Sequence, residues 1–437
     1  MCGTVQTMAD VIAPEDHAQE HLDTGVEILA PSTQFHDEAA TALQNLRRAL
    51  LDVLASIGGN ATEPQKLARS FSLNKNLTWK LSKVIRAADT FAAVTHMPGR
   101  AGMKIALDAF ERAGAGSDAI TRARLASDNF EHLVRRHSGD RQTMEAMVAG
   151  ASTSRAIQAQ RSEAHRKLAF RGNSAIWGVQ ARLQLSLHWV FPSQTPGMLD
   201  HAVVAGLVDF KRLRPDTRWS IALVRRTGAN WETENPAGVS PLSDSTAGTD
   251  RHTAAPLLSD FCSSPLPPVE FARGRPGIWR IELQPGAIGN TAALTCLAGW
   301  VNRGQTSAFR VGDDTHGRVF CTLGTPAELI LHDVFIHKEL NWDPNLTARV
   351  YGQLPTGPSG ADDGPPPELP MMPEIEVDDG DPIDLLTPDL PDYHKIVAYV
   401  LARLKLDLRS FTRTRLRLAY PPIPTLVSLE TRPPERP

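Results

Sequence analysis

The spacing of apolar residues changes sharply near Gly172, and this change limits what the chain can fold into. Before it, apolar residues recur every three or four positions, as they do along one face of a helix, for example at Leu43, Leu46, Leu50, Leu51 and Leu54. After it, apolar and polar residues alternate, which is the period of a strand. We therefore expect an α+β protein with an all-helical N-terminal part and a β-rich C-terminal part.

The helical spacing begins at Glu38 and continues to about Phe170. Glycine, proline and asparagine interrupt it where helices commonly end or begin. These interruptions predict a first helix that ends at Gly58-Gly59 and further helices over residues 62–71, 75–96, 101–114, 118–138 and 141–168.

The longest alternating stretch covers residues 179–191. It predicts a half-buried strand with one face in water, formed by the polar positions Gln180, Arg182, Gln184, Ser186 and His188. Shorter patterns predict one helix at 392–405 and strands at 218–226, 277–284, 317–323, 328–337, 346–352, 412–420 and 424–430. Because few helices separate these strands, we expect a mostly antiparallel or mixed sheet with one or two helices.

Charge is distributed unevenly, although the net charge is only −3. Residues 1–38 hold eight acidic side chains and no lysine or arginine, and residues 355–392 hold eleven acidic side chains and again no basic one. Residues 39–171, in contrast, carry 21 basic side chains against 11 acidic ones. This excess of positive charge on one segment favours a polyanionic partner.

At 437 residues the chain is long for one hydrophobic core, so we expect more than one domain. The patterns indicate an acidic disordered tail at 1–38, a basic helical domain at 39–171 and a β-rich domain at 172–437. Within the last domain, two stretches rich in proline, glycine, serine or acid are expected to be disordered insertions. They cover residues 227–276 and 355–391.

Features of targeting and of oxidised or membrane proteins are missing from the sequence. The N-terminus lacks the basic and apolar regions of a secretory signal, and no apolar run approaches the roughly 20 residues that cross a bilayer. The four cysteines, Cys2, Cys262, Cys296 and Cys321, lie far apart. They predict neither a disulfide framework nor a zinc knuckle, so we expect a cytoplasmic protein with free thiols and no membrane partner.

Residues 62–86 carry the most informative local pattern. Thr62 with Gln65 three residues later matches a capping box, and Pro64 falls in the first turn of the predicted helix. A turn at Ser72-Leu73-Asn74 follows, in which Asn74 can cap a second helix. The apolar residues of the two helices would face each other, namely Leu67, Ala68, Phe71, Leu77, Leu81, Val84 and Ile85.

This stretch resembles the helix-turn-helix of bacterial transcription regulators over about residues 40–97. Ala68 matches the position where the two helices approach closely, and Leu73 matches the position just after the turn. Ser72 stands where glycine is commonest, and Thr78 stands where a β-branched apolar residue is usual. The resemblance implies that the helix over 75–86 enters the major groove of duplex DNA.

The resemblance assigns the DNA contacts to the side of this helix that faces away from its apolar residues. These candidates are Lys75, Asn76, Trp79, Lys80, Lys83 and Arg86. For Trp79 the alternative is an indole packed against a neighbouring helix or a dimer partner, and for the whole pattern it is a three-helix unit with a solvated lysine face. A basic turn before the next helix adds Arg100 and Lys104, which we expect to contact the DNA backbone.

Signatures of the common catalytic sites are missing, among them those of P-loop, dinucleotide-binding, zinc-protease and serine-hydrolase sites. His332 and His337 are metal-ligand types, but residues five apart on a strand point to opposite faces and cannot share one ion. The sequence therefore assigns no catalytic residue, cofactor or metal, and it leaves an enzyme unsupported rather than excluded.

We therefore expect a DNA-binding protein, a transcriptional regulator that contacts duplex DNA through its helical domain. Its β-rich domain would bind a small ligand, a protein partner or a second copy of the chain. Two alternatives stay open: a helical interaction scaffold without DNA binding, or an uncharacterised enzyme with its site in the β-rich domain.

Overall fold

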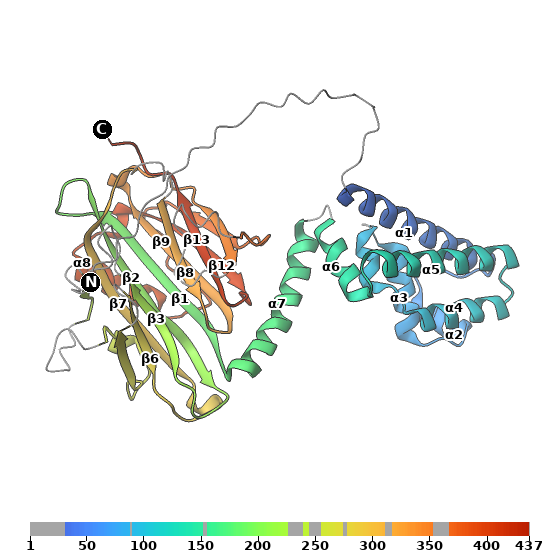
Figure 1. Cartoon of the computed structure of the whole chain (residues 1–437), viewed down its shortest axis with the longest axis horizontal. Coiled ribbons are helices and arrows are strands. Elements are labelled where there is room, and N and C mark those ends of the chain that lie inside the picture. The colour runs from blue at the N-terminus through green and yellow to red at the C-terminus, as the bar shows by residue number, and fades with distance from the viewer. Residues whose placement is uncertain are drawn as a thin grey trace, which may run out of the picture. The chain divides into compact units, whose positions relative to one another are not determined.

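The computed structural model describes residues 31–87, 90–151, 155–225, 239–243, 255–273, 278–310, 317–352 and 367–436. It confirms the α+β class, with helices in the N-terminal part and a mixed sheet in the C-terminal part (Figure 1). The chain divides into two compact units, Met1–Ser154 and Arg155–Pro437. Residues 155–171, which the sequence pattern groups with the helical domain, thus belong to the second unit.

The described part of the first unit is helical throughout. Its elements are α1 (Pro31–Ser56), α2 (Pro64–Ser70), α3 (Lys75–Arg86), the 3-10 helix η1 (Phe91–His96), α4 (Arg100–Arg112), α5 (Ser117–His137) and α6 (Arg141–Ala151). Four leucines of the α1 stripe, Leu43, Leu46, Leu50 and Leu54, are buried in one apolar core together with residues of α3, α4 and α5, whereas Leu51 is exposed. The core therefore forms where the sequence pattern places the apolar faces.

The prediction of a tail over residues 1–38 is wrong for residues 31–38, because α1 begins at Pro31. Phe35 is buried in the core, and Glu38 Oε2 lies 2.9 Å from His137 Nε2 of α5. An apolar anchor and a polar contact thus fix the first turns of α1. Residues 1–30 lie outside the described residues.

The single helix predicted over 75–96 is two elements, because α3 ends at Arg86 and η1 begins at Phe91. Arg47 of α1 donates hydrogen bonds to the carbonyl oxygens of Ile85 and Ala87, at 3.0 and 2.7 Å. A buried helix end needs such partners for its last carbonyls. The end of α3 is therefore set by a side chain from another helix, which local spacing does not reveal.

The second unit contains α7 (Arg155–Trp177), α8 (Tyr393–Leu404) and the strands of three sheets. The strands are β1 (Val179–Pro192), β2 (Met198–Arg212), β3 (Trp219–Arg225), β4 (Val239–Pro241), β5 (Val269–Arg273), β6 (Ile278–Leu283), β7 (Leu294–Ser307), β8 (Gly317–Leu323), β9 (Ala327–His337), β10 (Thr347–Gly352), β11 (Glu374–Asp378), β12 (Phe411–Ala419) and β13 (Thr425–Thr431). Helix α8 confirms the helix predicted at 392–405.

The largest sheet has seven strands in the order β11-β12-β9-β1-β2-β7-β4. Strands β1 and β9 run parallel, and the other paired strands of the described chain run antiparallel. Two smaller sheets have the orders β10-β13-β8 and β3-β6-β5. The predicted mixed, mostly antiparallel sheet is therefore confirmed.

The two faces of the large sheet pack against different layers. On one face, Leu185 and Trp189 of β1 pack with Tyr393 and Val397 of α8. On the other face, the large sheet packs against both small sheets in two separate apolar cores. Each central strand is therefore covered on both sides, as in a sandwich closed on one side by a helix.

The single helix predicted over 141–168 falls on two described helices, α6 and α7. Helix α7 extends beyond the predicted end to Trp177, and Gly178 with a φ of 73° ends it. Its Arg166 donates to the carbonyl oxygen of Ala419 at 2.9 Å, and the Phe170 ring lies 5.5 Å from the Tyr420 ring. These contacts attach α7 to the β-rich unit, which explains why the chain divides before this helix.

The predicted insertions at 227–276 and 355–391 are partly ordered. Strands β4 and β5 lie in the first, and β11 and the segment that leads to α8 lie in the second. These parts are held by strand pairing, β4 with β7, β5 with β6 and β11 with β12. The disorder prediction is therefore wrong for them, whereas residues 226–238, 244–254, 274–277 and 353–366 lie outside the described residues.

Candidate functional site

Helices α2 and α3 form a helix pair joined by the short turn that the sequence predicts. Pro64 occupies the start of α2, and Asn74 Oδ1 accepts a hydrogen bond from the backbone N–H of Asn76 at 2.8 Å, so both predicted end signals are present. Ser72 adopts a φ of 52°, the left-handed conformation that favours glycine. The capping box is wrong: Glu63 is the N-cap of α2, and the Thr62 hydroxyl donates to Asn60 Oδ1 instead.

The inward side of α3 is buried and contains two polar residues. Leu81, Val84 and Ile85 lie in the apolar core as predicted. Thr78 and Ser82 are buried beside them, and their hydroxyl groups donate to backbone carbonyl oxygens, Thr78 to Lys75 and Ser82 to Ala61. Because both hydroxyls are satisfied, a polar Thr78 fits where an apolar residue is more usual.

All six sequence-predicted contact residues of α3 lie on its exposed side, namely Lys75, Asn76, Trp79, Lys80, Lys83 and Arg86. At 100° per residue they fall within an arc of roughly 140°. Within the described residues, none of the four cations of this group forms an ion pair with a carboxylate. We call these six residues the α3 face.

Trp79 lies on the surface rather than in the core, since 47% of the residue is exposed. Its ring contacts His96 of η1 edge-on at 5.5 Å, and Lys83 Nζ lies 5.4 Å from the ring centroid. The indole thus packs beside a neighbouring element, and about half of the residue stays exposed within the α3 face.

The second predicted pair, Arg100 and Lys104, is exposed on the first turns of α4. This part of α4 lies beside α3, because Gly102 packs against Leu77. Lys104 forms an ion pair with Asp108 at 2.6 Å, and this contact and Arg124 lower the pKa of that carboxyl group. Its charge is therefore partly neutralised within the chain, unlike the charges of the α3 face.

In the β-rich unit, the polar positions of β1 form a buried cluster. The predicted water-facing side is wrong for Gln184, Ser186 and His188, which are buried beneath the small sheets, whereas Gln180 and Arg182 are partly exposed. His188 Nε2 lies 2.7 Å from the Ser186 hydroxyl, and its Nδ1 lies 2.9 Å from Nε2 of His201 on β2. The His332 ring of β9 packs edge-on against His188 at 5.0 Å.

This row of polar side chains crosses four neighbouring strands. Ser186 of β1 pairs in register with His332 of β9, and His201 of β2 pairs with Asn302 of β7. Burial lowers the pKa of His188 and of His332, and it lowers the pKa of His201 to about 4. The imidazoles are therefore neutral near pH 7 and serve as hydrogen-bonding groups rather than charges.

A cavity of about 830 Å³ opens along this row. Strands β1, β2 and β7 line one side of it, and β3 and β8 of the small sheets line the other. Its volume lies within the range of small-molecule sites. Sequence reasoning missed it, because its walls come from segments far apart in the chain, and the alternation within β1 was the one local signal.

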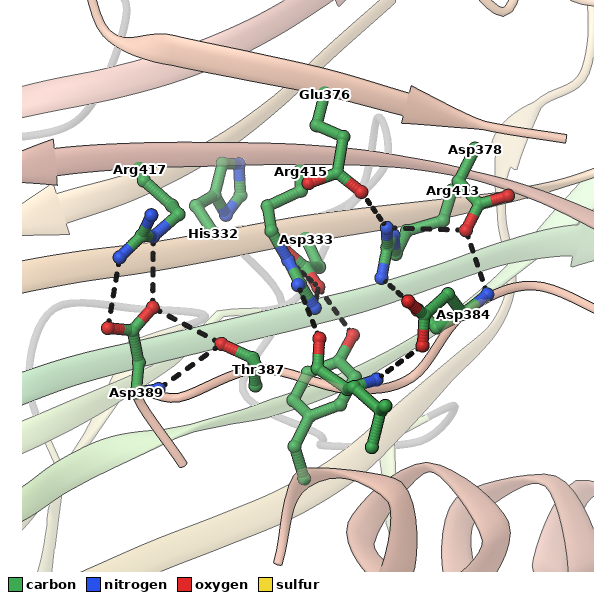
Figure 2. Close-up of polar contacts among 12 residues, drawn as sticks. His332, Asp333, Glu376, Asp378, Asp384, Thr387, Asp389, Arg413, Arg415 and Arg417 are labelled. Atoms are coloured by element: carbon green, nitrogen blue, oxygen red, sulfur yellow. Dashed lines mark hydrogen bonds and ion pairs between the residues drawn. The ribbon is translucent and has the colours of Figure 1, made fainter. Parts of the chain in front are cut away.

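The opposite face of the large sheet carries an arginine row on β12, Arg413, Arg415 and Arg417 (Figure 2). Arg415 is buried and donates to Asp333 of β9, with Nη2 2.8 Å from Oδ2, and the hydroxyl of Tyr393 donates to the same carboxylate. Burial and the charge of Asp333 raise the pKa of Tyr393 well above its ordinary value, so the phenol keeps its proton. These groups satisfy each other and leave no reactive group exposed.

The acidic segment before α8 supplies the remaining partners of this row. Figure 2 shows Glu376 and Asp378 beside Arg413 and Asp389 beside Arg417. This pairing is the physical reason that residues 367–391 are ordered despite their composition. On β9, His332 packs against His188 on the side of the small sheets, and His337 packs against Phe411 in the core on the α8 side, so the two side chains point to opposite faces as their spacing predicts.

Comparisons with protein-family models, with curated proteins and with solved structures find no match to this chain. Within the described residues, no helix has the length and apolarity that a membrane span needs. The same part of the chain contains no group of three or more histidine, cysteine or acidic side chains that could hold a metal ion. The α3 face and the cavity of the β-rich unit are therefore the two features of the described chain that bear on its function.

Proposed function

We propose that this chain is a cytoplasmic DNA-binding protein, a transcriptional regulator that contacts duplex DNA through α3 and binds a ligand or partner with its β-rich unit. The observation that carries the proposal is the α3 face, which presents four cations and one amide without an acidic side chain among them. Lysine and arginine neutralise phosphates, and an asparagine amide can pair with adenine.

The packing of α3 supports this proposal. Its inward side is buried and its last carbonyls are held by Arg47, so its outward side is presented on a fixed helix. A groove-reading helix needs such rigid support, because base contacts depend on position. Cations elsewhere in the unit, such as Lys104 and Arg124, have carboxylate partners. The α3 face is therefore better suited to an external polyanion.

The first experiment measures binding of the full chain to a random duplex by fluorescence anisotropy over a salt series. We expect the double variant Lys80→Gln/Lys83→Gln to lower affinity at low salt at least about tenfold and to reduce the salt slope by about two, one for each lost phosphate contact. The matched control is Arg48→Gln/Arg135→Gln, which removes two exposed cations from α1 and α5. It should change affinity less than about twofold.

The second experiment tests base recognition. A preferred duplex is selected from a random library with the full chain, and Asn76→Ala is then measured on that duplex and on random DNA. A loss of about 1–3 kcal/mol confined to the selected duplex would agree with a base contact. Absence of duplex binding by the folded full chain would instead favour the helical scaffold, and equal losses in both double variants would place the interface outside α3.

A further inference from the structure

Three residues that line the cavity each hold a buried polar atom without a hydrogen-bond partner among the described residues, namely Gln184 Oε1, Trp300 Nε1 and Asn302 Oδ1. All three residues are more than nine-tenths buried. Gln184 Nε2 donates to the carbonyl oxygen of Thr322 at 2.9 Å, which fixes the amide with its oxygen unpaired. Because buried polar groups are normally satisfied, one donor and two acceptors around one cavity indicate a bound partner.

The walls of the cavity are rich in aromatic rings, namely Trp177, Trp219, Trp300, Phe309, Phe320 and Trp342. Aromatic side chains offer flat surfaces to a flat ligand, and each offset or edge-to-face pair adds to the burial energy. Aliphatic side chains of β2, Leu199 and Val203, complete the apolar surface. This combination of an apolar wall and a few polar atoms is typical of small-molecule sites.

The charges around the cavity favour an uncharged ligand. The described residues that line it include no aspartate, glutamate or lysine. Its three arginines lie within 4 Å of carboxylates, Arg280 of Glu282, Arg310 of Glu435 and Arg318 of Glu430. A ligand cation would find no lining carboxylate, and a ligand anion would compete with those carboxylates, so either charge would be desolvated at a cost.

We propose that this cavity binds an uncharged, planar heteroaromatic small molecule whose N–H group donates to Asn302 or Gln184 and whose carbonyl oxygen accepts from Trp300. The inference deepens the ligand-binding part of the proposed function and is independent of the DNA-binding part. The neutral histidines His188 and His201 complete the polar row without adding a charge.

The test is isothermal titration of the full chain with quinolin-2-one, which carries one N–H donor and one carbonyl acceptor on the same edge of a planar ring system. We expect saturable one-to-one binding. Removal of the donor in 1-methylquinolin-2-one should weaken binding at least about tenfold, the effect of one lost hydrogen bond. Quinoline-2-carboxylate and 1-methylquinolinium, which carry a negative and a positive charge, should also bind at least about tenfold more weakly.

Variants assign the binding to the cavity. Trp300→Phe removes the indole donor and keeps a ring, and Asn302→Leu removes the amide oxygen at similar volume, so each should weaken quinolin-2-one binding about tenfold. The matched control is Trp189→Phe, because the Trp189 indole N–H is also buried without a partner but faces α8 on the other side of the large sheet. This control should bind as the parent chain does.

The proposal is overturned if quinolin-2-one does not bind, which would leave the polar atoms to water alone, or if it binds as tightly as its N-methyl derivative. Equal effects of Trp300→Phe and Trp189→Phe would also overturn it. The same samples are assayed for duplex binding. Loss of duplex binding with probe binding retained contradicts only the DNA-binding proposal, and the reverse result contradicts only this inference.

Discussion

At the scale of residues, a buried histidine makes the free energy of unfolding of the β-rich unit depend on pH. The pKa of His201 falls to about 4 in the folded chain, from 6.5 when it is exposed, because burial disfavours the imidazolium. Between these two values the unfolded chain binds a proton that the folded chain does not bind. The free energy of unfolding therefore falls as the pH is lowered through this window, and it changes no further from this group below about pH 4.

We expect His201→Gln to reduce this pH dependence and to leave the part that the buried His188 and His332 contribute. The titration of His201 contributes up to about 3 kcal/mol over the window, at about 1.4 kcal/mol per pH unit. Urea unfolding of the full chain, followed by tryptophan fluorescence between pH 4.5 and 7.5, measures the slope. His394→Gln, at an exposed position of α8, is the control and should keep the parent slope. A parent chain with equal stability across the window would contradict the prediction.

At the scale of residues, the sequence predicts features that depend on neighbouring positions in the chain. The cap at Asn74 and the exposed side of α3 follow from positions a few residues apart, and both are present in the structure. The partners of His188 could not be predicted, because His201 and His332 come from other strands and no nearby residue specifies them. The alternation within β1 predicts that its polar residues share one face, but it does not predict that the small sheets cover this face.

At the scale of elements, strands β9 and β12 are joined by backbone pairing and by a buried ion pair. Asp333 and Arg415 lie opposite each other in register, and both side chains are buried. Removing one charge from such a pair leaves the other buried without compensation. The two buried charges compensate each other only when β9 and β12 pair in this register, so the register is needed for stability.

We predict that Asp333→Asn lowers the free energy of unfolding by about 3–5 kcal/mol, because the Arg415 guanidinium loses its only buried carboxylate among the described residues. The control is Glu374→Gln at the exposed end of the same arginine row, where Glu374 pairs with Arg417 across 3.4 Å. Solvent screens that pair, so the control should unfold close to the parent chain. The measurement is the denaturant midpoint of the parent chain and of both variants at one pH. Equal losses of stability in the two variants would contradict the prediction.

Elements whose apolar residues recur with a clear period were predicted, whereas two long strands without such a period were not. Strand β1 alternates and was found, as were α5 and α8. Strands β2 and β7 were missed, because both lie inside the large sheet with layers on both faces and their apolar residues do not alternate. Fully covered strands lack the polar face that marks a strand in sequence.

At the scale of the whole molecule, the charged segments differ in how far their charges are paired within the chain, which composition alone does not show. Part of the acidic segment at 367–391 is neutralised by β12, so its negative charge is largely committed within the β-rich unit. The excess of basic residues in the helical part has no such partner segment in the described chain. The acidic residues of 1–30 are the nearest in sequence to those helices.

We predict that deletion of residues 1–30 raises the affinity of the chain for random duplex at low salt. The deleted residues carry carboxylates and no cation, and a tethered anionic segment competes with phosphate at a high local concentration. The effect should vanish as salt rises, since the Debye length is about 8 Å at physiological ionic strength. Because α1 begins at Pro31, thermal stability should change little. Anisotropy over a salt series measures the difference, and identical curves would show that these residues only add charge.

The position of β13 has a consequence for the order in which the protein matures during synthesis. Strand β13 is the middle strand of the sheet β10-β13-β8, yet it is the last strand of the described chain. Domains generally fold as units while the ribosome advances, so the helical unit can fold long before this sheet has its centre. The part of the cavity wall formed by β8 therefore lacks its paired strand until β13 is made. A nascent chain would acquire α3 with its exposed face first and the cavity of the β-rich unit last.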